Sequence, residues 1–240
     1  MKSKIATLFL VTCMCILALS SCKKDENPDV PSGPTITDID GNVYHTVKIG
    51  NQTWTVENLK TTHYRNGDPI PENPDNWSWL TTDAYCNILD DDSYTETYGR
   101  LYNWYAVNDP RGLAPEGWHI PSDAEWKELE MYLGMTLETA DQTGKRGTLE
   151  GNKLKAEGND HWTGNNAGTN ETGFYALPTS GRSYGGAWNS APGPDAFFWT
   201  STTDADPARA WLRQLISADG SIGRYNYSKT YGFGVRCVKD

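Results

Sequence analysis

Apolar and polar positions alternate most regularly near the start of the folded part of the chain, over residues 36–60. Two alternating runs flank Gly50 and Asn51, a dipeptide that suits the tight turn of a β-hairpin. A repeat of every second residue is typical of a half-buried strand. We therefore predict a hairpin whose alternating side chains are Val43, His45, Val47, Ile49, Trp54 and Val56.

Apolar residues spaced three and four apart predict two short helices. Residues 98–107 carry Leu101, Trp104 and Tyr105 at this spacing. Residues 121–134 carry more signals: a leading proline, a capping box, an apolar stripe and a terminating glycine. These belong to Pro121, Ser122, Glu125, Trp126, Leu129, Leu133 and Gly134. A brief further helix is expected near Leu149–Ala156.

The last third of the chain has short apolar runs between clusters of Gly, Asn, Pro and Asp, a pattern of loop-rich β structure. The runs are Phe174–Leu177, Phe197–Ser201, Ala210–Ile216 and Gly232–Val238. Helices in the first part and strands toward both ends predict an α+β class with mixed or antiparallel strands. Residues 36–240 are enough for one core, so a single domain is expected.

The first residues have the layout of a secretory signal peptide: basic residues up to Lys4, then an uncharged apolar run from Ile5 to Leu19. That run is too short for a typical membrane-spanning helix. The following Leu-Ser-Ser-Cys resembles a bacterial lipobox, which implies removal of residues 1–21 and acylation of Cys22. Acyl chains on Cys22 would hold the protein to a lipid bilayer. The alternative is an ordinary signal peptide that happens to contain a cysteine.

Residues 22–35 are rich in Pro, Gly, Ser and charge, so we expect a flexible tether after the anchor. Its start, Lys-Lys-Asp-Glu-Asn, resembles the export tag of surface lipoproteins in Bacteroidetes-type bacteria. The resemblance implies an outer membrane lipoprotein exposed on the cell surface. A solvated charge run is the alternative.

The mature chain is acidic. Removal of residues 1–21 takes away Lys2 and Lys4, which leaves 19 Lys and Arg against 31 Asp and Glu, a formal charge of −12. A negative surface repels phosphate backbones and anionic lipid headgroups, so a nucleic-acid partner is not expected.

Cysteine usage predicts a disulfide. Cys13 and Cys15 leave with the signal peptide and Cys22 carries lipid, so Cys86 and Cys237 remain in the folded part. Two thiols in an oxidising compartment are expected to pair. The histidines show no ligand spacing around either cysteine, so we expect neither a metal nor a cofactor. They are His45, His63, His119 and His161.

Catalytic patterns are weak in this chain. Asp90-Asp91-Asp92 and Asp204-x-Asp206 could supply paired carboxylates, but exposed acidic turns explain both runs. Asp38-x-Asp40-Gly-Asn42 starts like a calcium loop, yet Ile49 occupies the position of the closing glutamate, which favours a turn. Residues 183–187 are glycine-rich but lack the lysine of a phosphate loop. We therefore expect no enzymatic activity.

Aromatic residues are the most suggestive candidates for binding, since the chain has ten Trp and thirteen Tyr but five Phe. Tyr and Trp combine a flat apolar face with a polar edge, which suits sugar rings and protein surfaces. Five of the tryptophans are expected in the core and not at a binding surface: Trp54, Trp104, Trp118, Trp126 and Trp199. Those in polar, irregular stretches are the ligand-binding candidates, namely Trp77, Trp79, Tyr184, Trp188, Tyr225 and Tyr227.

Seven segments, in order, resemble the Fibrobacter succinogenes major paralogous domain, a family of secreted and lipoprotein domains. They include YGRLYNWYAVND at 98–109, GLAPEGWHIPSDAEWKELEMYLG at 112–134 and YGFGVRCVKD at 231–240, and together they cover nearly all of residues 38–240. Many members of this family carry one cysteine just before the segment that matches residues 98–109 and another in the segment that matches residues 231–240. This supports a Cys86–Cys237 bridge.

GWHIPSDAEW and GFGVR are also similar to segments of formylglycine-generating and sulfatase-modifying enzymes, which have a C-type-lectin-like fold. This resemblance implies that the hairpin near residue 45 lies beside the final strand. It also implies that loops 182–195 and 217–230 contribute to a binding face. Those enzymes hold copper with a cysteine pair, whereas here Cys237 is alone in the corresponding region.

The sequence thus predicts a surface-anchored, non-catalytic binding or adhesion module for polysaccharide or for a partner protein. The alternative is a structural subunit of a cell-surface assembly, such as a pilus tip or envelope complex.

Overall fold

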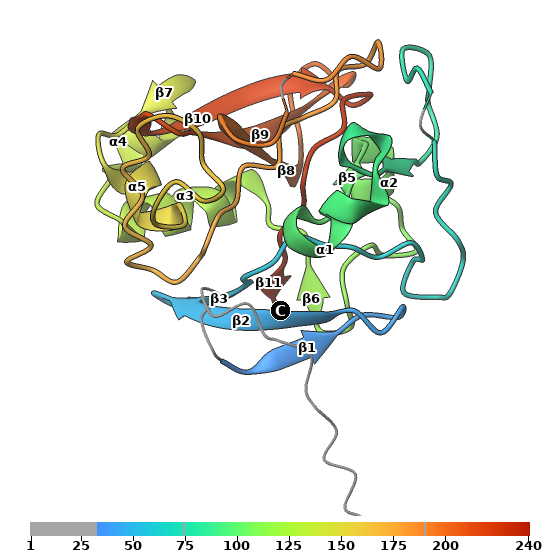
Figure 1. Ribbon diagram of the computed structural model, residues 1–240, viewed down its shortest axis with the longest axis horizontal. Helices are drawn as coiled ribbons and strands as arrows, with labels where there is room; N and C mark the ends of the chain where they lie inside the picture. The colour runs from blue at the N-terminus through green and yellow to red at the C-terminus, as the bar shows by residue number, and fades with distance from the viewer. Residues whose placement is uncertain (1–32, 74, 190) are drawn as a thin grey trace, which may run out of the picture.

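The computed structural model describes residues 33–73, 75–189 and 191–240. The predicted signal peptide, Cys22 and most of the predicted tether lie outside these residues. Figure 1 shows one sheet at the bottom of the molecule and a second at the top, with α3, α4 and α5 on one side and α1 and α2 on the other. The antiparallel sheets and short helices confirm the α+β class.

The lower sheet joins the two ends of the domain. Its strands, in spatial order, are β1 (Thr35–Thr37), β2 (Val43–Ile49), β3 (Gln52–Thr55), β11 (Val238–Lys239) and β6 (Trp118–His119). The predicted hairpin is β2–β3, and Gly50 has the φ of 60° that the first central position of a type II′ turn requires. Val238 pairs with Trp54, so the final strand lies beside the hairpin, as the sequence predicts.

The upper sheet is antiparallel. Its order is β7 (Gly144–Arg146), β10 (Asp219–Ser228), β9 (Arg209–Ile216) and β8 (Asp195–Thr203). Both faces of β8 are buried: Phe198 packs in one hydrophobic cluster, and Phe197 and Trp199 pack in the other. The sheet therefore divides the core, and all five tryptophans expected in the core are buried, namely Trp54, Trp104, Trp118, Trp126 and Trp199.

The predicted helix after residue 121 is α3 (Asp123–Tyr132). The Ser122 hydroxyl accepts from the Glu125 amide at 3.2 Å, while the Glu125 carboxylate accepts from the Ser122 amide at 2.7 Å. This is the complete capping box. Two further helices follow, α4 (Leu137–Asp141) and α5 (Glu150–Leu154), of which the second is the brief helix expected near 149–156.

The predicted helix over residues 98–107 is wrong. The segment contains the end of α1 (Thr95–Tyr98), the short strand β5 (Leu101–Tyr102) and α2 (Trp104–Val107). Gly99 adopts φ 77° and ψ −167°, which ends α1, and β5 then pairs with β4 (Tyr85–Cys86). Between β4 and α1 lie two 3₁₀ turns, Ile88–Asp90 and Asp92–Tyr94.

Two predicted strands are also absent from the described chain as regular strands. In Phe174–Leu177, Tyr175 has a φ of 52°, which breaks an extended run, and Ala176 alone forms a bridge. Residues 232–238 change partner repeatedly: Gly232 bridges Arg182, Phe233 bridges Tyr102, and pairing with β3 follows only at Val238.

Buried charges connect α3 to the upper sheet. Glu130, fully buried, accepts two hydrogen bonds from the Arg146 guanidinium at 2.7 and 2.9 Å and is also bound by Arg213. Asp123 is bound by Arg213 and Arg224 at 2.8 Å. Burial opposes ionisation of Asp123, but these guanidinium groups outweigh it and lower its pKa well below the usual range.

A further buried cation holds the lower sheet against the core. The Arg236 guanidinium donates to the carbonyl oxygens of Thr55 and Phe174 at 2.9 and 3.0 Å. It also lies 4.7 Å from the centroid of the Phe174 ring. Burial lowers the pKa of Arg236 to about 9. Arg236 therefore positions the last segment of the chain.

No helix in the described ranges has the combined length and apolar character that crossing a bilayer would require.

Candidate functional site

Four tyrosines form a row at one end of the upper sheet, which we call the tyrosine ladder: Tyr184, Tyr231, Tyr227 and Tyr225, in spatial order. Neighbouring ring centroids lie 5.6, 5.1 and 6.4 Å apart along this row. The rings of Tyr227 and Tyr231 are nearly parallel, with an interplanar angle of 12°. The ladder is a continuous aromatic surface, because Tyr184 is 51% exposed and the other three are half-buried.

Strand geometry and two turns position the ladder. Tyr225 and Tyr227 are two residues apart on β10, so their side chains project from the same face of the strand. A turn closed by the Tyr231 amide and the Ser228 carbonyl, 3.0 Å apart, returns Tyr231 beside Tyr227. Phe233 lies under the middle rings, 5.7 Å from Tyr231 and 5.9 Å from Tyr227, and anchors the ladder to the core.

Tyr184 reaches the ladder from a second segment. The loop that carries it folds back as a small hairpin in which Arg182 bridges Trp188. The Ser78 hydroxyl donates to the Tyr184 carbonyl at 3.3 Å, which brings the segment around Trp79 to the same end of the molecule. These two segments appear in orange and teal at the upper right of Figure 1. Trp79 is 93% exposed and lies next to the segment that contacts Tyr184.

The sequence placed Tyr225 and Tyr227 in a long loop over residues 217–230, and this prediction is wrong. They lie on β10, which pairs with β9 from Asp219 to Ser228. Gly220 and Gly223 obscure the apolar alternation of this strand in the sequence. Tyr231 was not predicted as a binding residue, although it lies in the same polar segment as Tyr225 and Tyr227, and this proximity could have identified it.

Trp77 is not a solvent-facing binding residue, contrary to the prediction. It is fully buried, and its indole N–H donates to the Asn73 carbonyl at 2.9 Å. The Arg182 guanidinium lies 5.3 Å from the ring centroids of both Trp77 and Trp188. Trp188 is therefore half-buried beside a cation.

The predicted disulfide is absent: Cys86 and Cys237 are free, buried thiols. They belong to different hydrophobic clusters, Cys86 with Trp77 and Ile88, and Cys237 with Trp199 and Phe233. Burial raises the pKa of the Cys86 thiol to about 12, and burial also raises that of Cys237.

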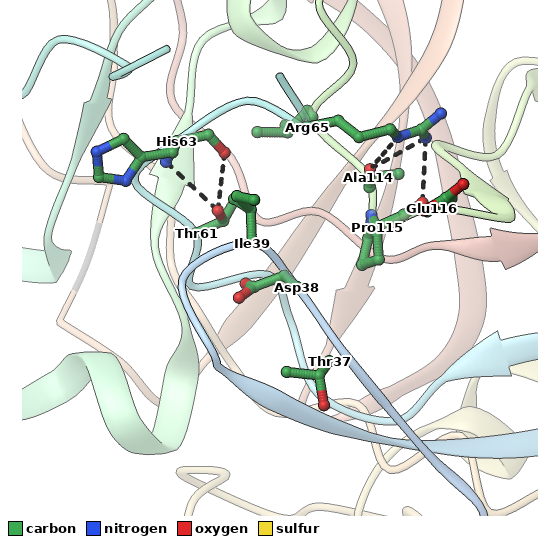
Figure 2. Close-up of a pocket in the computed structure, with 10 residues that line it drawn as sticks. Thr37, Asp38, Ile39, Thr61, His63, Arg65, Ala114, Pro115 and Glu116 are labelled. Atoms are coloured by element: carbon green, nitrogen blue, oxygen red, sulfur yellow. Dashed lines mark hydrogen bonds between the residues drawn. The ribbon is translucent and has the colours of Figure 1, made fainter. Parts of the chain in front are cut away.

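A pocket of about 220 Å³ lies between the β1–β2 turn and residues 113–116. Figure 2 shows the residues that line it. Its cation, Arg65, donates to the carbonyl oxygens of Ala114, Pro115 and Trp118 at 2.8–3.1 Å. On another wall, Asp38 accepts the Tyr44 hydroxyl at 2.6 Å. Arg65 and Asp38 are thus already engaged within the fold, and none of the lining residues is Tyr, Trp or Phe, which makes this pocket a weak candidate for a stacked ligand.

The Asp38–Asn42 segment is a turn and not a calcium loop. The Asp38 carbonyl accepts from the Gly41 amide at 3.1 Å, and its carboxylate accepts from two amides of the same turn. Asp40 binds Thr61, Thr62 and His63 instead. Burial opposes ionisation of the Asp40 carboxyl, but its hydrogen bonds with Thr61, Thr62 and His63 outweigh burial and lower the pKa of Asp40.

The two acidic runs take local partners. Asp90 pairs with Arg182 at 3.1 Å, Asp204 accepts from the Asn226 side chain at 2.7 Å, and Asp206 lies 3.6 Å from Arg209. Throughout the described residues, no group of three or more His, Cys, Asp or Glu side chains is placed to hold a metal ion. The tyrosine ladder with Trp79 is therefore the candidate site that the predicted aromatic residues form.

Residues 47–239 match the sequence model of the Fibrobacter succinogenes major domain. The match covers most of the chain and confirms the family resemblance of the quoted segments. No curated protein sequence and no solved structure matches the chain.

Proposed function

The chain belongs to the Fibrobacter succinogenes major domain family, and we propose that it is a surface-anchored, non-catalytic module that binds polysaccharide. The observation that carries this proposal is the tyrosine ladder with exposed Trp79 beside it. Such rings stack on the apolar faces of sugars, while tyrosine hydroxyls bond sugar hydroxyls. A row of rings from two segments suits an extended chain of sugar units.

Charges beside the ladder are balanced, which favours an uncharged polysaccharide. Arg209 pairs with Asp206 and donates to the Asn226 side chain at 3.0 Å, and Asn226 in turn binds Asp204. Burial raises the pKa of Tyr231, and the neighbouring rings of Tyr184 and Tyr227 add to this effect. Tyr231 therefore stays neutral at physiological pH, and stacking and hydrogen bonding carry the recognition.

The proposal includes a C-type-lectin-like arrangement and a place on the outer face of the outer membrane. The pairing of β11 with β3 supports the first, because it brings the two ends of the domain together. The lipobox-like segment before Cys22 and the charged run after it support the second. Acylated Cys22 would leave the ladder free to face the surroundings of the cell.

Binding to glycan arrays and to insoluble plant fibre tests the proposal, using protein with Cys22→Ser in place of the lipid anchor. We expect the double variant Tyr184→Ala, Tyr231→Ala to weaken retention at least about tenfold, since each lost stacking contact contributes roughly 1 kcal/mol. Tyr132→Ala is the matched control, because Tyr132 is an exposed tyrosine on α3. Absence of wild-type binding across the whole panel would refute polysaccharide binding.

The second candidate function is a structural subunit of a surface assembly, and an open strand edge favours it. β7 pairs with β10 only from Ile222 to Arg224, so no described strand covers Tyr225–Ser228 on that side. Such an edge can accept a strand from a partner protein. Crosslinking on intact cells separates the two functions, because an assembly subunit should recover one stoichiometric partner.

A further inference from the structure

A second pocket, lined in part by Trp104 and Tyr105, lies next to the tyrosine ladder, and none of its lining residues was predicted to bind a ligand. It has a volume of about 330 Å³ and lies between residues 81–83 and residues 104–110. This volume falls at the lower end of the range of about 300–1,000 Å³ typical of small-molecule sites. Lys229 connects it to the ladder: it lies between Tyr227 and Tyr231 in the chain, and its ammonium lies 4.0 Å over the Trp104 ring.

The pocket is held in a fixed shape by one buried amide. The Asn103 side chain caps α2 by accepting from the Ala106 amide at 3.0 Å, and it also accepts from the Ala84 amide at 3.1 Å. Its NH₂ group donates to the Thr82 carbonyl at 2.8 Å. Both walls of the pocket are therefore joined through Asn103. Trp104, in the lining, is fixed by its indole N–H, which donates to the Thr200 carbonyl at 2.9 Å.

The lining offers both kinds of contact that a sugar needs. Tyr105 is half-buried and presents an aromatic ring, and exposed Asn108 can donate and accept hydrogen bonds. Thr82, whose side chain carries a hydroxyl, lines the same pocket. An aromatic ring surrounded by a few amide, hydroxyl and carboxylate groups is the usual composition of a site for a small polar ligand.

Charge at the pocket selects against acids. Arg111 lies between carboxylates, with its guanidinium 2.8 Å from Asp83, 2.8 Å from Asp109 and 3.6 Å from Asp68. The lining itself holds two carboxylates, Asp83 and Asp109, and none of its residues is a Lys or Arg. The excess negative charge would repel a uronic acid or a sulfated sugar and tolerate a neutral or amino sugar.

We propose that this pocket binds one neutral or amine-bearing hexose unit, as a subsite separate from the tyrosine ladder. This inference rests on the proposed polysaccharide binding and adds the class of sugar: the ladder holds inner units of the chain, and the pocket holds one unit at its end or on a branch. Tyr105 stacks on the sugar ring, Asn108 exchanges hydrogen bonds with its hydroxyl groups, and the negative charge of Asp83 and Asp109 attracts an ammonium group where the sugar carries one.

The test uses single sugars, which are too small to need the ladder. Saturation-transfer NMR with glucose, galactose, mannose, glucosamine and galacturonate at up to about 50 mM detects even millimolar binding. We expect at least one of the first four sugars to bind and galacturonate not to bind. Tyr105→Ala and Asn108→Ala should each weaken that binding at least about fivefold, whereas the control Tyr132→Ala should leave it unchanged. Asn108 is exposed, so its variant keeps the test valid even where Tyr105→Ala affects folding.

Three results would overturn the inference: no binding by any of the four sugars, binding of galacturonate in preference to them, or loss of binding in Tyr184→Ala with none in the pocket variants. Failure of the pocket inference can be distinguished from failure of the proposed polysaccharide binding. Retention on plant fibre that depends on the ladder, together with no binding of single sugars, refutes the pocket alone. No binding of either polymer or single sugar refutes both.

Discussion

His119 shows how a single side chain can couple remote parts of this fold. Its Nδ1 lies 2.6 Å from the Asp240 carboxylate, and its Nε2 lies 2.7 Å from the Glu125 carboxylate of the capping box. Burial opposes protonation of the ring, but the hydrogen bonds and charges of these two carboxylates outweigh it and raise the pKa of His119. Protonated His119 therefore ties the final strand to the start of α3.

The raised pKa makes the stability of the protein depend on pH near neutrality. The stabilisation by His119 is fully present below the unfolded value of 6.5 and is lost as pH rises through the higher folded pKa. We expect the free-energy difference between wild type and His119→Gln, from urea unfolding followed by Trp fluorescence, to be larger at about pH 5.5 than at about pH 8.5. Asp240→Asn should reduce this dependence, and a difference that is constant with pH would contradict the assignment.

Among the helices, α3 depends most on charge for its attachment to a sheet. Glu130 has no solvent exposure, and its carboxylate is bound by guanidinium groups from β7 and β9. Removal of its charge would take away the carboxylate that pairs with buried Arg146 and one of the two carboxylates that pair with Arg213. Breaking a buried pair in this way typically costs about 3–5 kcal/mol.

We therefore expect Glu130→Gln to lower the free energy of unfolding by about 3–5 kcal/mol, measured by urea denaturation. Glu128→Gln is the matched control on the same helix, since Glu128 is exposed, and it should change stability by no more than about 0.5 kcal/mol. Similar values for the two variants would show that the buried network contributes little.

Elements governed by local signals could be predicted from the sequence. The β2–β3 hairpin follows from its turn, and α3 follows from its capping box, because neighbouring residues supply the necessary hydrogen bonds. Residues 98–107 could not be predicted, because contacts with β4 override the helical spacing of Leu101. Similarly, Gly232 and Phe233 bond to segments distant in sequence, which periodicity does not reveal.

At the scale of the whole molecule, alkylation can distinguish the free thiols of the structure from the disulfide that the sequence predicts. Both cysteines are buried and their pKa values are raised, so neither should react with iodoacetamide in the folded protein near neutral pH. After unfolding without any reductant, we expect peptide mapping to find Cys86 and Cys237 both alkylated. Labelling that required prior reduction would mean that the two thiols are paired.

The candidate site was predicted only in part, because exposure is a property of the whole packed molecule. Trp77 and Trp79 stand two residues apart in the same polar stretch, yet one is fully buried and the other is 93% exposed. Composition does not separate them, since the burial of Trp77 depends on Arg182 and on the cluster around Cys86. Tyr184, predicted as a binding candidate, is 51% exposed, but its neighbours in the ladder come from another segment.

Pairing of the first hairpin with the last strand has a kinetic consequence. Thr55 and Cys237, which are hydrogen-bonded in the lower sheet, stand 182 residues apart in the chain. During synthesis the β3 edge of the hairpin remains unpaired until residue 238 has emerged from the ribosome and can pair with it. Because contacts at such separation form slowly, we expect this sheet to close late in folding, and a nascent chain stalled before residue 237 to remain open to proteases.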